Sequence, residues 1–274
     1  MLLKWQRYRG GIMGRIEGVF ARRKKPAFIG FTVAGDPDKD TCMRAAMALV
    51  EGGTDILELG VPFSDPVSDG PTIQNADERS LAAGTTVDTV FEIVRQLRKK
   101  TNVPIVFLTY YNMVYHRGID RFYQEACEAG VDGILIADMP FEESDDVYET
   151  SLRYGIDLIF LITQTTSNER IKKIAARAHG YLYLVAVLGV TGVRDTVSSG
   201  AINLLQRVRK HTAIPLALGF GISTPDHAKV CAGAGADGVI VGSAIVDIIE
   251  KDLGNPDNMI GNLKAYVEQM KKAL

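Results

Sequence analysis

The sequence predicts an α/β fold: a single closed (βα)8 barrel with one extra helix ahead of the first strand. Eight short apolar runs recur along the 274 residues, as is typical of parallel strands that are covered on both faces. Amphipathic segments of helical length lie between them, and no break in composition divides the chain into two domains. A doubly wound open sheet is the alternative, but eight consecutive units favour closure into a TIM barrel.

The predicted strands and helices alternate along the whole chain. The strands span residues 27–33, 55–60, 104–110, 133–138, 157–163, 181–187, 215–220 and 238–242. The clearest helical patterns lie at residues 41–53, 120–130 and 168–178. Four residues are of the types that cap helix starts, namely Asp38, Asp40, Thr224 and Asp226.

A weak internal repeat supports regular winding. The pattern Gly-x-Asp stands between a helix end and a strand three times, beginning at Gly53, Gly130 and Gly235. The tripeptides VPI at 103–105 and IPL at 214–216 likewise introduce two of the strands. Such repetition is expected of one barrel that is built from similar units.

The N-terminal segment differs in charge from the rest of the chain. Residues 1–25 carry eight Lys or Arg and one acidic residue, Glu17. A targeting segment is one interpretation, but there is no continuous apolar stretch of the secretory kind and no serine. We therefore predict that residues 1–13 are a surface or disordered extension, or an upstream start before a natural first residue at Met13. Residues 14–274 are predicted to form the barrel.

Composition argues against several classes of protein. Hydrophobic residues make up 46% of the chain and charged residues 23%, and the net charge is −2. Neither nucleic acid nor an anionic membrane is therefore an expected partner, and no apolar run approaches the roughly 20 residues that span a bilayer. Cys42, Cys127 and Cys231 are far apart and odd in number, which favours reduced, half-buried thiols in a cytoplasmic protein.

A glutamate stands inside the second predicted strand. If Leu57 and Leu59 face the surrounding helices, then Ile56, Glu58 and Gly60 face the barrel interior, because side chains alternate along a strand. Glu58 then lies near the carboxyl end of its strand, where such barrels build active sites. Burial should raise the pKa of Glu58 toward neutrality, where it can take up and return a proton. The alternative is a salt bridge to a neighbouring strand, but none of the eight strands contains Lys or Arg.

The loop after this strand holds a second candidate, Asp69. This loop, residues 62–74, is long for a connection between a strand and a helix, and long connections in compact domains are often functional. It also contains Asp65 and three prolines. Taken alone, Asp65 and Asp69 would be turn residues more often than catalysts.

Glycine-containing segments follow the last three predicted strands, at residues 189–192, 219–223 and 242–246. Glycine lets the backbone approach a ligand closely, and loops after strands seven and eight bind phosphate in many barrels. Ser243 is expected to cap the next helix, whose N-terminus attracts negative charge. Because no lysine lies in these segments, backbone amides and hydroxyls would hold the phosphate. The segment GFGIS lacks the third glycine of a dinucleotide site.

Missing residue types narrow the chemistry further. Schiff-base catalysis needs a lysine on a strand, and none is present. A metal site needs clustered ligands, whereas the histidines are scattered and only His116 is near the catalytic end. We therefore predict no metal, and acid–base catalysis by carboxylates on a phosphorylated substrate.

One motif is highly specific, ELGVPFSDPxxDGPTIQ at residues 58–74. GDP at residues 35–37 precedes it, and the segments GVTG, GFGIS and GSAIV follow in order. In this combination the chain resembles the tryptophan synthase alpha subunit family over residues 15–273. The resemblance implies a barrel that cleaves indole-3-glycerol phosphate to indole and glyceraldehyde 3-phosphate, a carbon–carbon lyase step of tryptophan biosynthesis. It implies no cofactor in this chain, and as partner a beta subunit that carries pyridoxal phosphate in an alpha2beta2 heterotetramer.

The resemblance also implies a role for each matching residue. Glu58 would protonate the indole ring carbon and relay the glycerol hydroxyl proton, and Asp69 would pair with the indole N–H. The phosphate site would comprise Gly192, Gly221, Gly242 and Ser243. The indole pocket would comprise Phe31, Leu108, Tyr183 and Phe220, although each of these alone is more often plain core. Thr191 would be the threonine of a lid loop, residues 189–200.

The chain departs from the family pattern in two places. Residues 185–188 read Val-Ala-Val-Leu where many bacterial members have an arginine, which bears on how the lid loop is held shut. Ser68 replaces a common alanine. Two alternatives stay open beside the catalytic subunit of a complex: a free-standing indole-3-glycerol phosphate lyase, and a non-catalytic barrel retained as an allosteric module.

Overall fold

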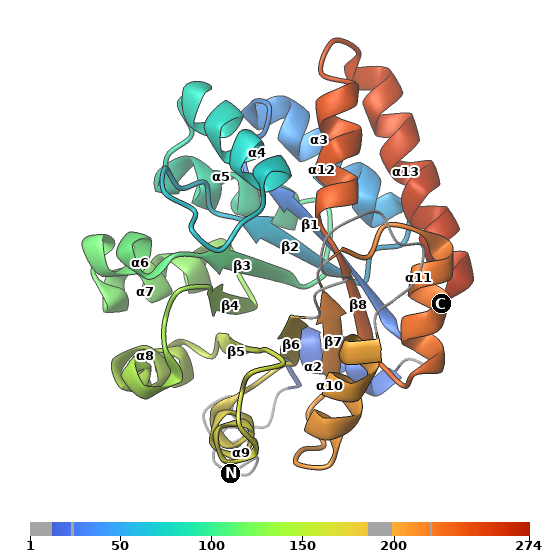
Figure 1. Cartoon of the computed structure of the whole chain (residues 1–274). Helices are drawn as coiled ribbons and strands as arrows, with labels where there is room; N and C mark the ends of the chain where they lie inside the picture. Colours follow the sequence, from blue (N-terminus) through green and yellow to red (C-terminus); the bar gives the residue numbers. More distant parts are fainter. Residues whose placement is uncertain (1–12, 23–24, 186–198, 220) are drawn as a thin grey trace.

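Eight parallel strands close into a barrel in the computed structural model, which describes residues 13–22, 25–185, 199–219 and 221–274. Each strand pairs with its neighbour in chain order, and β1 pairs with β8 to close the ring (Figure 1). The strands are β1 (Ala27–Val33), β2 (Ile56–Gly60), β3 (Ile105–Thr109), β4 (Gly133–Ile136), β5 (Asp157–Ile162), β6 (Leu182–Val185), β7 (Leu216–Gly219) and β8 (Gly238–Val241). The predicted fold class is confirmed, and each predicted strand begins within one residue of the observed one.

Helices surround the barrel on its outer face (Figure 1). They are α2 (Arg15–Arg22), α3 (Lys39–Glu51), α4 (Pro71–Ala82), α5 (Val87–Arg98), α6 (Tyr111–Arg117), α7 (Ile119–Ala129), α8 (Asp145–Tyr154), α9 (Asn168–Arg177), α10 (Ser199–Arg209), α11 (Pro225–Gly233), α12 (Ser243–Lys251) and α13 (Pro256–Ala273), with a 3-10 turn η1 (Phe141–Glu143). Asp38 and Thr224 are the N-caps of α3 and α11, and their side chains accept backbone N–H groups. Asp40 and Asp226 lie in the first turns instead, so the expected caps were right for two residues of four.

The core has two apolar layers that follow from the alternation of side chains along the strands. Leu57 and Leu59 lie in the larger layer, between the barrel and the helices. Ile56 lies in the smaller layer, which fills the barrel interior. Because Glu58 has the parity of Ile56, its side chain lies on the interior side of β2. Phe31 of β1 is its register partner across the sheet.

Helix α2 closes the amino-terminal end of the barrel. Ile16 on this helix is fully buried and packs with the interior layer, so the extra N-terminal helix is an integral part of the core. Residues 1–12 lie outside the described residues, and the extension at residues 1–13 stays a prediction.

The cysteines differ in burial from the expectation. Cys42 and Cys231 are buried, whereas Cys127 is exposed. The helix patterns did not show which cysteine lies on the covered face. In the part of the chain that the structure describes, no helix is both long and apolar enough to cross a membrane.

Candidate active site

A cavity of about 350 Å³ opens at the carboxyl end of the barrel. Every predicted site residue that the structure describes lines it, namely Phe31, Glu58, Asp69, Leu108, Tyr183, Gly221, Gly242 and Ser243. These residues come from six strands or the segments that follow them, and parallel strands bring those ends to one face. The cavity therefore unites residues that lie up to about 210 positions apart, from Phe31 to Ser243.

Glu58 lies at the inner wall of this cavity and is only 1% exposed. Burial raises its pKa to about 8, while a hydrogen bond from Tyr181 opposes the rise and the charge of Asp69 adds to it. The Tyr181 contact is long, at 3.5 Å between Oη and Oε1. Among the residues described, Oε2 has no hydrogen-bond partner and no cation forms an ion pair with the carboxyl. Among the described residues, Glu58 therefore does not form the salt bridge that was the alternative interpretation of its sequence position.

Asp69 is half-buried on the loop between β2 and α4. Tight turns shape this loop, since Asp69 N donates to the Pro66 carbonyl at 3.0 Å and Val67 N donates to Asp65 at 2.9 Å. Tyr110 Oη donates to Asp69 Oδ2 at 2.6 Å. Burial raises the pKa of Asp69, and the hydrogen bond from Tyr110 acts against that rise. The two carboxyls of the cavity are thus in different surroundings: Glu58 accepts only a long contact of 3.5 Å, whereas Asp69 accepts a short hydrogen bond of 2.6 Å.

The predicted phosphate residues line the same cavity, after β7 and β8. Gly221 has a φ of 77°, a conformation that favours glycine. Ser243 does not cap α12 as expected: Gly242 occupies the N-cap position, and no side-chain cap hydrogen bond is made. Ser243 is the first helical residue, and because it lines the cavity its hydroxyl and the α12 N-terminus share one side of it.

Aromatic rings form the apolar wall, and glycines make room for them. A Cβ on Gly219 would lie 2.5 Å from the Tyr183 hydroxyl, and a Cβ on Gly60 would lie 2.9 Å from the Phe31 ring. Real side chains do not approach so closely, so both rings depend on a glycine at the end of a neighbouring strand. Leu108 packs against the interior layer and against a small apolar cluster that contains Phe31 and Ile73.

Three predicted residues lie outside the described residues, namely Thr191, Gly192 and Phe220. Their roles stay predictions, as does the lid loop to which Thr191 belongs.

Sequence reasoning did not identify Tyr110, Tyr181 and Ile73. Tyr181 has the parity of Tyr183 on the same strand, which is a signal that alternation could have used. Ile73 lies within the loop motif and lines the cavity. Tyr110 ends the third predicted strand, but nothing local indicates that its hydroxyl reaches Asp69.

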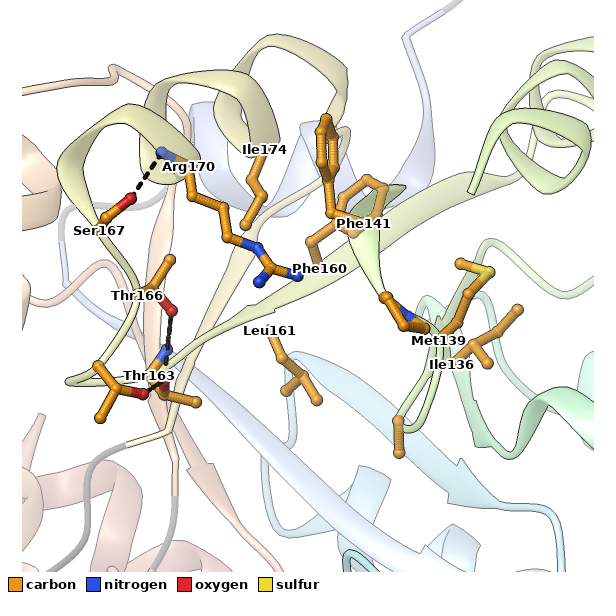
Figure 2. Close-up of a pocket in the computed structure, with 13 residues that line it drawn as sticks. Ile136, Met139, Phe141, Phe160, Leu161, Thr163, Thr166, Ser167, Arg170 and Ile174 are labelled. Carbon is orange, nitrogen blue, oxygen red and sulfur yellow. Dashed lines mark hydrogen bonds between the residues drawn. The ribbon is translucent and has the colours of Figure 1, made fainter. Parts of the chain in front are cut away.

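Figure 2 shows a second pocket, of about 430 Å³, above β4 and β5. Phe141, Phe160 and Arg170 are among its lining residues, and no carboxylate lines it. The Arg170 guanidinium donates to Glu142 at 2.7 Å. Since none of the predicted site residues lies there, we place the candidate chemistry in the cavity that holds Glu58.

The described residues contain no group of three or more His, Cys, Asp or Glu side chains that could hold a metal ion. The absence of a metal from the site stays a prediction.

Comparison with known proteins identifies the family. The chain matches the family described as tryptophan synthase alpha chain over residues 19–274. It is 70% identical over 262 residues to the tryptophan synthase alpha chain of Methanoregula boonei, covering 96% of this chain and 99% of that one. A solved chain of the tryptophan synthase a2b2 complex from Pyrococcus furiosus has a TM-score of 0.86 and 38% identity, covering 91% of this chain and 99% of that one. The chain therefore belongs to the tryptophan synthase alpha chain family.

Proposed function

We propose that Glu58 and Asp69 are the pair of carboxyls with which this chain performs the reaction of its family. Tryptophan synthase alpha chains cleave indole-3-glycerol phosphate to indole and glyceraldehyde 3-phosphate in tryptophan biosynthesis, so the chain is a carbon–carbon lyase. The observation that carries the assignment is Glu58, buried in the cavity with a pKa of about 8. Near neutral pH this carboxyl holds a proton that it can transfer to a ring carbon.

In the proposed cleavage, Glu58 gives one proton to the substrate and then takes one proton back from it. Glu58 protonates the indole carbon that bears the glycerol chain, and the ring nitrogen becomes positively charged. The Glu58 carboxylate then accepts the proton of the hydroxyl on the adjacent glycerol carbon. A C=O bond forms there, the carbon–carbon bond breaks, and its electron pair returns to the ring. Because the protonated ring is the electron sink, the step needs no imine.

Asp69 has the complementary role in this proposal. Its carboxylate accepts the indole N–H and stabilises the positive charge that develops on the nitrogen. The phosphate would bind at Gly221, Gly242 and Ser243, of which the last two lie at the N-terminus of α12. Phe31, Leu108 and Tyr183 would hold the ring between these two ends.

The alpha chain of this family needs no cofactor of its own, since pyridoxal phosphate belongs to the beta subunit. The solved Pyrococcus furiosus relative is part of an a2b2 complex. We propose the same partner for this chain, and a cytoplasmic location. The loop between β2 and α4 is the segment that we expect to contact the partner; it ends at Gly70, earlier than the predicted residue 74, because α4 begins at Pro71. The free-standing lyase would use the same two carboxyls. A non-catalytic barrel would not require a buried acid that has no cation as partner among the described residues.

Glu58→Gln tests the assignment. It keeps the size of the side chain but cannot exchange the proton, so indole release should fall at least about 100-fold. Binding of a non-cleavable indole alkyl phosphate, measured by calorimetry, should stay within a few-fold. Glu78→Gln, an exposed change on α4, is the matched control. A Glu58→Gln protein that keeps more than about a tenth of wild-type turnover contradicts the proton-transfer role.

A second measurement separates the complex from the free-standing enzyme. Indole release is followed with purified chain alone and after addition of a tryptophan synthase beta subunit. Slow cleavage alone and faster cleavage with the partner is the expected result. Full activity without a partner supports the free-standing lyase instead.

A further inference from the structure

The Asp69 carboxylate is held by a residue outside the loop motif, Tyr110, directly after β3. Its hydroxyl donates to Asp69 Oδ2 at 2.6 Å and accepts from the backbone N–H of Ser68 at 3.1 Å. An amide N–H can only donate, so the Ser68 contact uses a lone pair of the hydroxyl oxygen. The hydroxyl proton is therefore directed to Asp69, as a donor to a carboxylate.

Tyr110 is itself held in one position by the loop that carries Asp69. The Phe63 ring stacks on the Tyr110 ring with 5.1 Å between centroids, and Tyr110 is only 2% exposed. Gln74 Nε2 donates to the backbone carbonyl oxygen of Asp69 at 2.8 Å, and this hydrogen bond fixes the backbone of the residue that carries the carboxylate. The loop thus folds around the tyrosine at Phe63, Ser68 and Asp69.

The other ionisable groups around Asp69 are acidic. Glu58 faces it from β2, Asp77 from α4 and the Tyr183 phenol from β6. No ion pair to Asp69 is formed within the described ranges, and Arg79, the cation on α4, contacts Asp36 and Glu250 instead. Burial raises the pKa of Asp69, and the hydrogen bond from Tyr110 is the interaction that lowers it.

We infer that Tyr110 is a positioning residue of the reaction: it keeps Asp69 ionised while Glu58 is still protonated, and leaves the second Asp69 oxygen for the substrate. This inference rests on the proposed function. Two carboxyls in one cavity can take different roles only if their surroundings separate their protonation. Burial acts on both groups in the same direction and each accepts a tyrosine hydroxyl, but the contact to Asp69 is 2.6 Å and that to Glu58 is 3.5 Å. The shorter contact favours the charged form of Asp69 more strongly, and this difference divides the roles.

The pH profile of Tyr110→Phe tests this inference with the full chain saturated with a beta subunit. Loss of the hydroxyl should raise the Asp69 pKa, so the acidic limb of kcat/KM should move up by about one pH unit. At any pH below the acidic limb of the wild type that shift is a loss of about tenfold, because one unit is a factor of ten. The basic limb, which reports Glu58, should stay in place. A merely structural effect would lower the whole profile without moving the acidic limb.

Tyr111→Phe is the matched control, the same change one residue away on α6 at a hydroxyl that does not contact Asp69. Its profile should match the wild type. Carboxyl carbon NMR, with the Asp69 signal identified by its loss in Asp69→Asn, measures the same pKa shift without turnover. Phe63→Leu keeps the hydroxyl but loosens the stack, and should shift the limb in the same direction by less.

An acidic limb and an Asp69 titration that are unmoved in Tyr110→Phe, or moved equally in Tyr111→Phe, overturn the inference. The proposed function is tested separately. If Glu58→Gln is inactive while Tyr110→Phe behaves in this way, only the role of Tyr110 is lost.

Discussion

The aspartates of the Gly-x-Asp repeats, at the amino-terminal end of the barrel, and the two acids of the cavity, at the carboxyl end, have opposite surroundings. At the amino-terminal end, the three aspartates of the Gly-x-Asp repeats each accept a backbone N–H from the preceding strand in the barrel and pair with a cation. Asp55 accepts Phe28 N at 2.7 Å and pairs with Lys271 at 2.6 Å. Asp132 accepts Ile105 N at 2.9 Å and pairs with Arg98 at 2.5 Å.

Asp237 repeats this arrangement, since it accepts Leu216 N at 2.8 Å and pairs with Arg209. At the carboxyl end, Glu58 and Asp69 have tyrosine hydroxyls as partners and no cation among the residues described. The repeat acids thus have an ion pair and an amide donor each, whereas burial pushes Glu58 toward its neutral form. The difference teaches that the repeat acids join strands at one end of this barrel, whereas the two acids of the cavity at the other end stay without a cation and available for protons.

The largest effect should come from breaking a paired acid, Asp132. Asp132→Ala removes two ion pairs and one backbone contact, and leaves Arg98, 11% exposed at its side chain, without its carboxylate. We expect a loss of roughly 3 kcal/mol in the free energy of unfolding, measured by urea denaturation. Turnover per folded molecule should stay within about twofold, because the change lies at the end opposite to the cavity.

Asp120→Ala is the control for this change. Its ion pair with Arg153 is exposed on both sides, at 57% and 60%, so its loss should cost less than about 1 kcal/mol. Equal losses for Asp132→Ala and Asp120→Ala would show that the amino-terminal pairs are ordinary surface contacts.

A smaller effect of opposite sign is expected from removing the unpaired acid. The folded pKa of Glu58 lies at about 8, above its ordinary value of 4.5. The glutamate therefore favours folding fully below about pH 4.5, and this contribution is lost as the pH rises to about 8. Glu58→Gln should consequently gain stability over the wild type across that window, by roughly 2 kcal/mol at pH 6.

Urea denaturation of both proteins at pH 5 and pH 6 measures this gain. The stability difference should grow with pH and then level off. A difference that is the same at both pH values means that Glu58 titrates normally, and the contrast between the two ends would then disappear.

The strands and the inward direction of Glu58 were predictable because they depend on local periodicity. The alternation of Leu57, Glu58 and Leu59 decides which side chain faces the interior once the strand forms. The cavity was predictable for a similar reason, since parallel strands in one barrel bring their carboxyl ends to one face. The specific motif then selected which residues to expect there.

The partners of the carboxylates were not predictable from local pattern. Tyr110 reaches Asp69 across the gap between β3 and the preceding loop, and that contact depends on how the loop turns at Pro66. Lys271 reaches Asp55 from the last helix, 216 positions away. Ser243 was wrong as a cap because a glycine immediately before it can take the N-cap position as well.

The smallest effect concerns the glycine that begins each repeat, and Gly235 isolates it. Gly235 has a φ of 89°, and a Cβ added there would meet no atom within 4 Å. Gly235→Ala should therefore lower the free energy of unfolding by about 1 kcal/mol through backbone conformation alone. Turnover should not change, because Asp237 still reaches its strand.

Gly233→Ala gives the opposite sign two residues earlier. Gly233 ends α11 without a positive φ, and a Cβ there also meets no atom within 4 Å. Alanine should stabilise the helix end by up to about 0.5 kcal/mol, since it restricts the unfolded chain without straining the folded one. Both positions have room for a Cβ, and only Gly235 has a positive φ. The difference between the two variants in thermal unfolding therefore measures the effect of backbone conformation alone. If both shift the midpoint in the same direction, the glycine of the repeat is not required by its conformation, and only the aspartate defines the amino-terminal device.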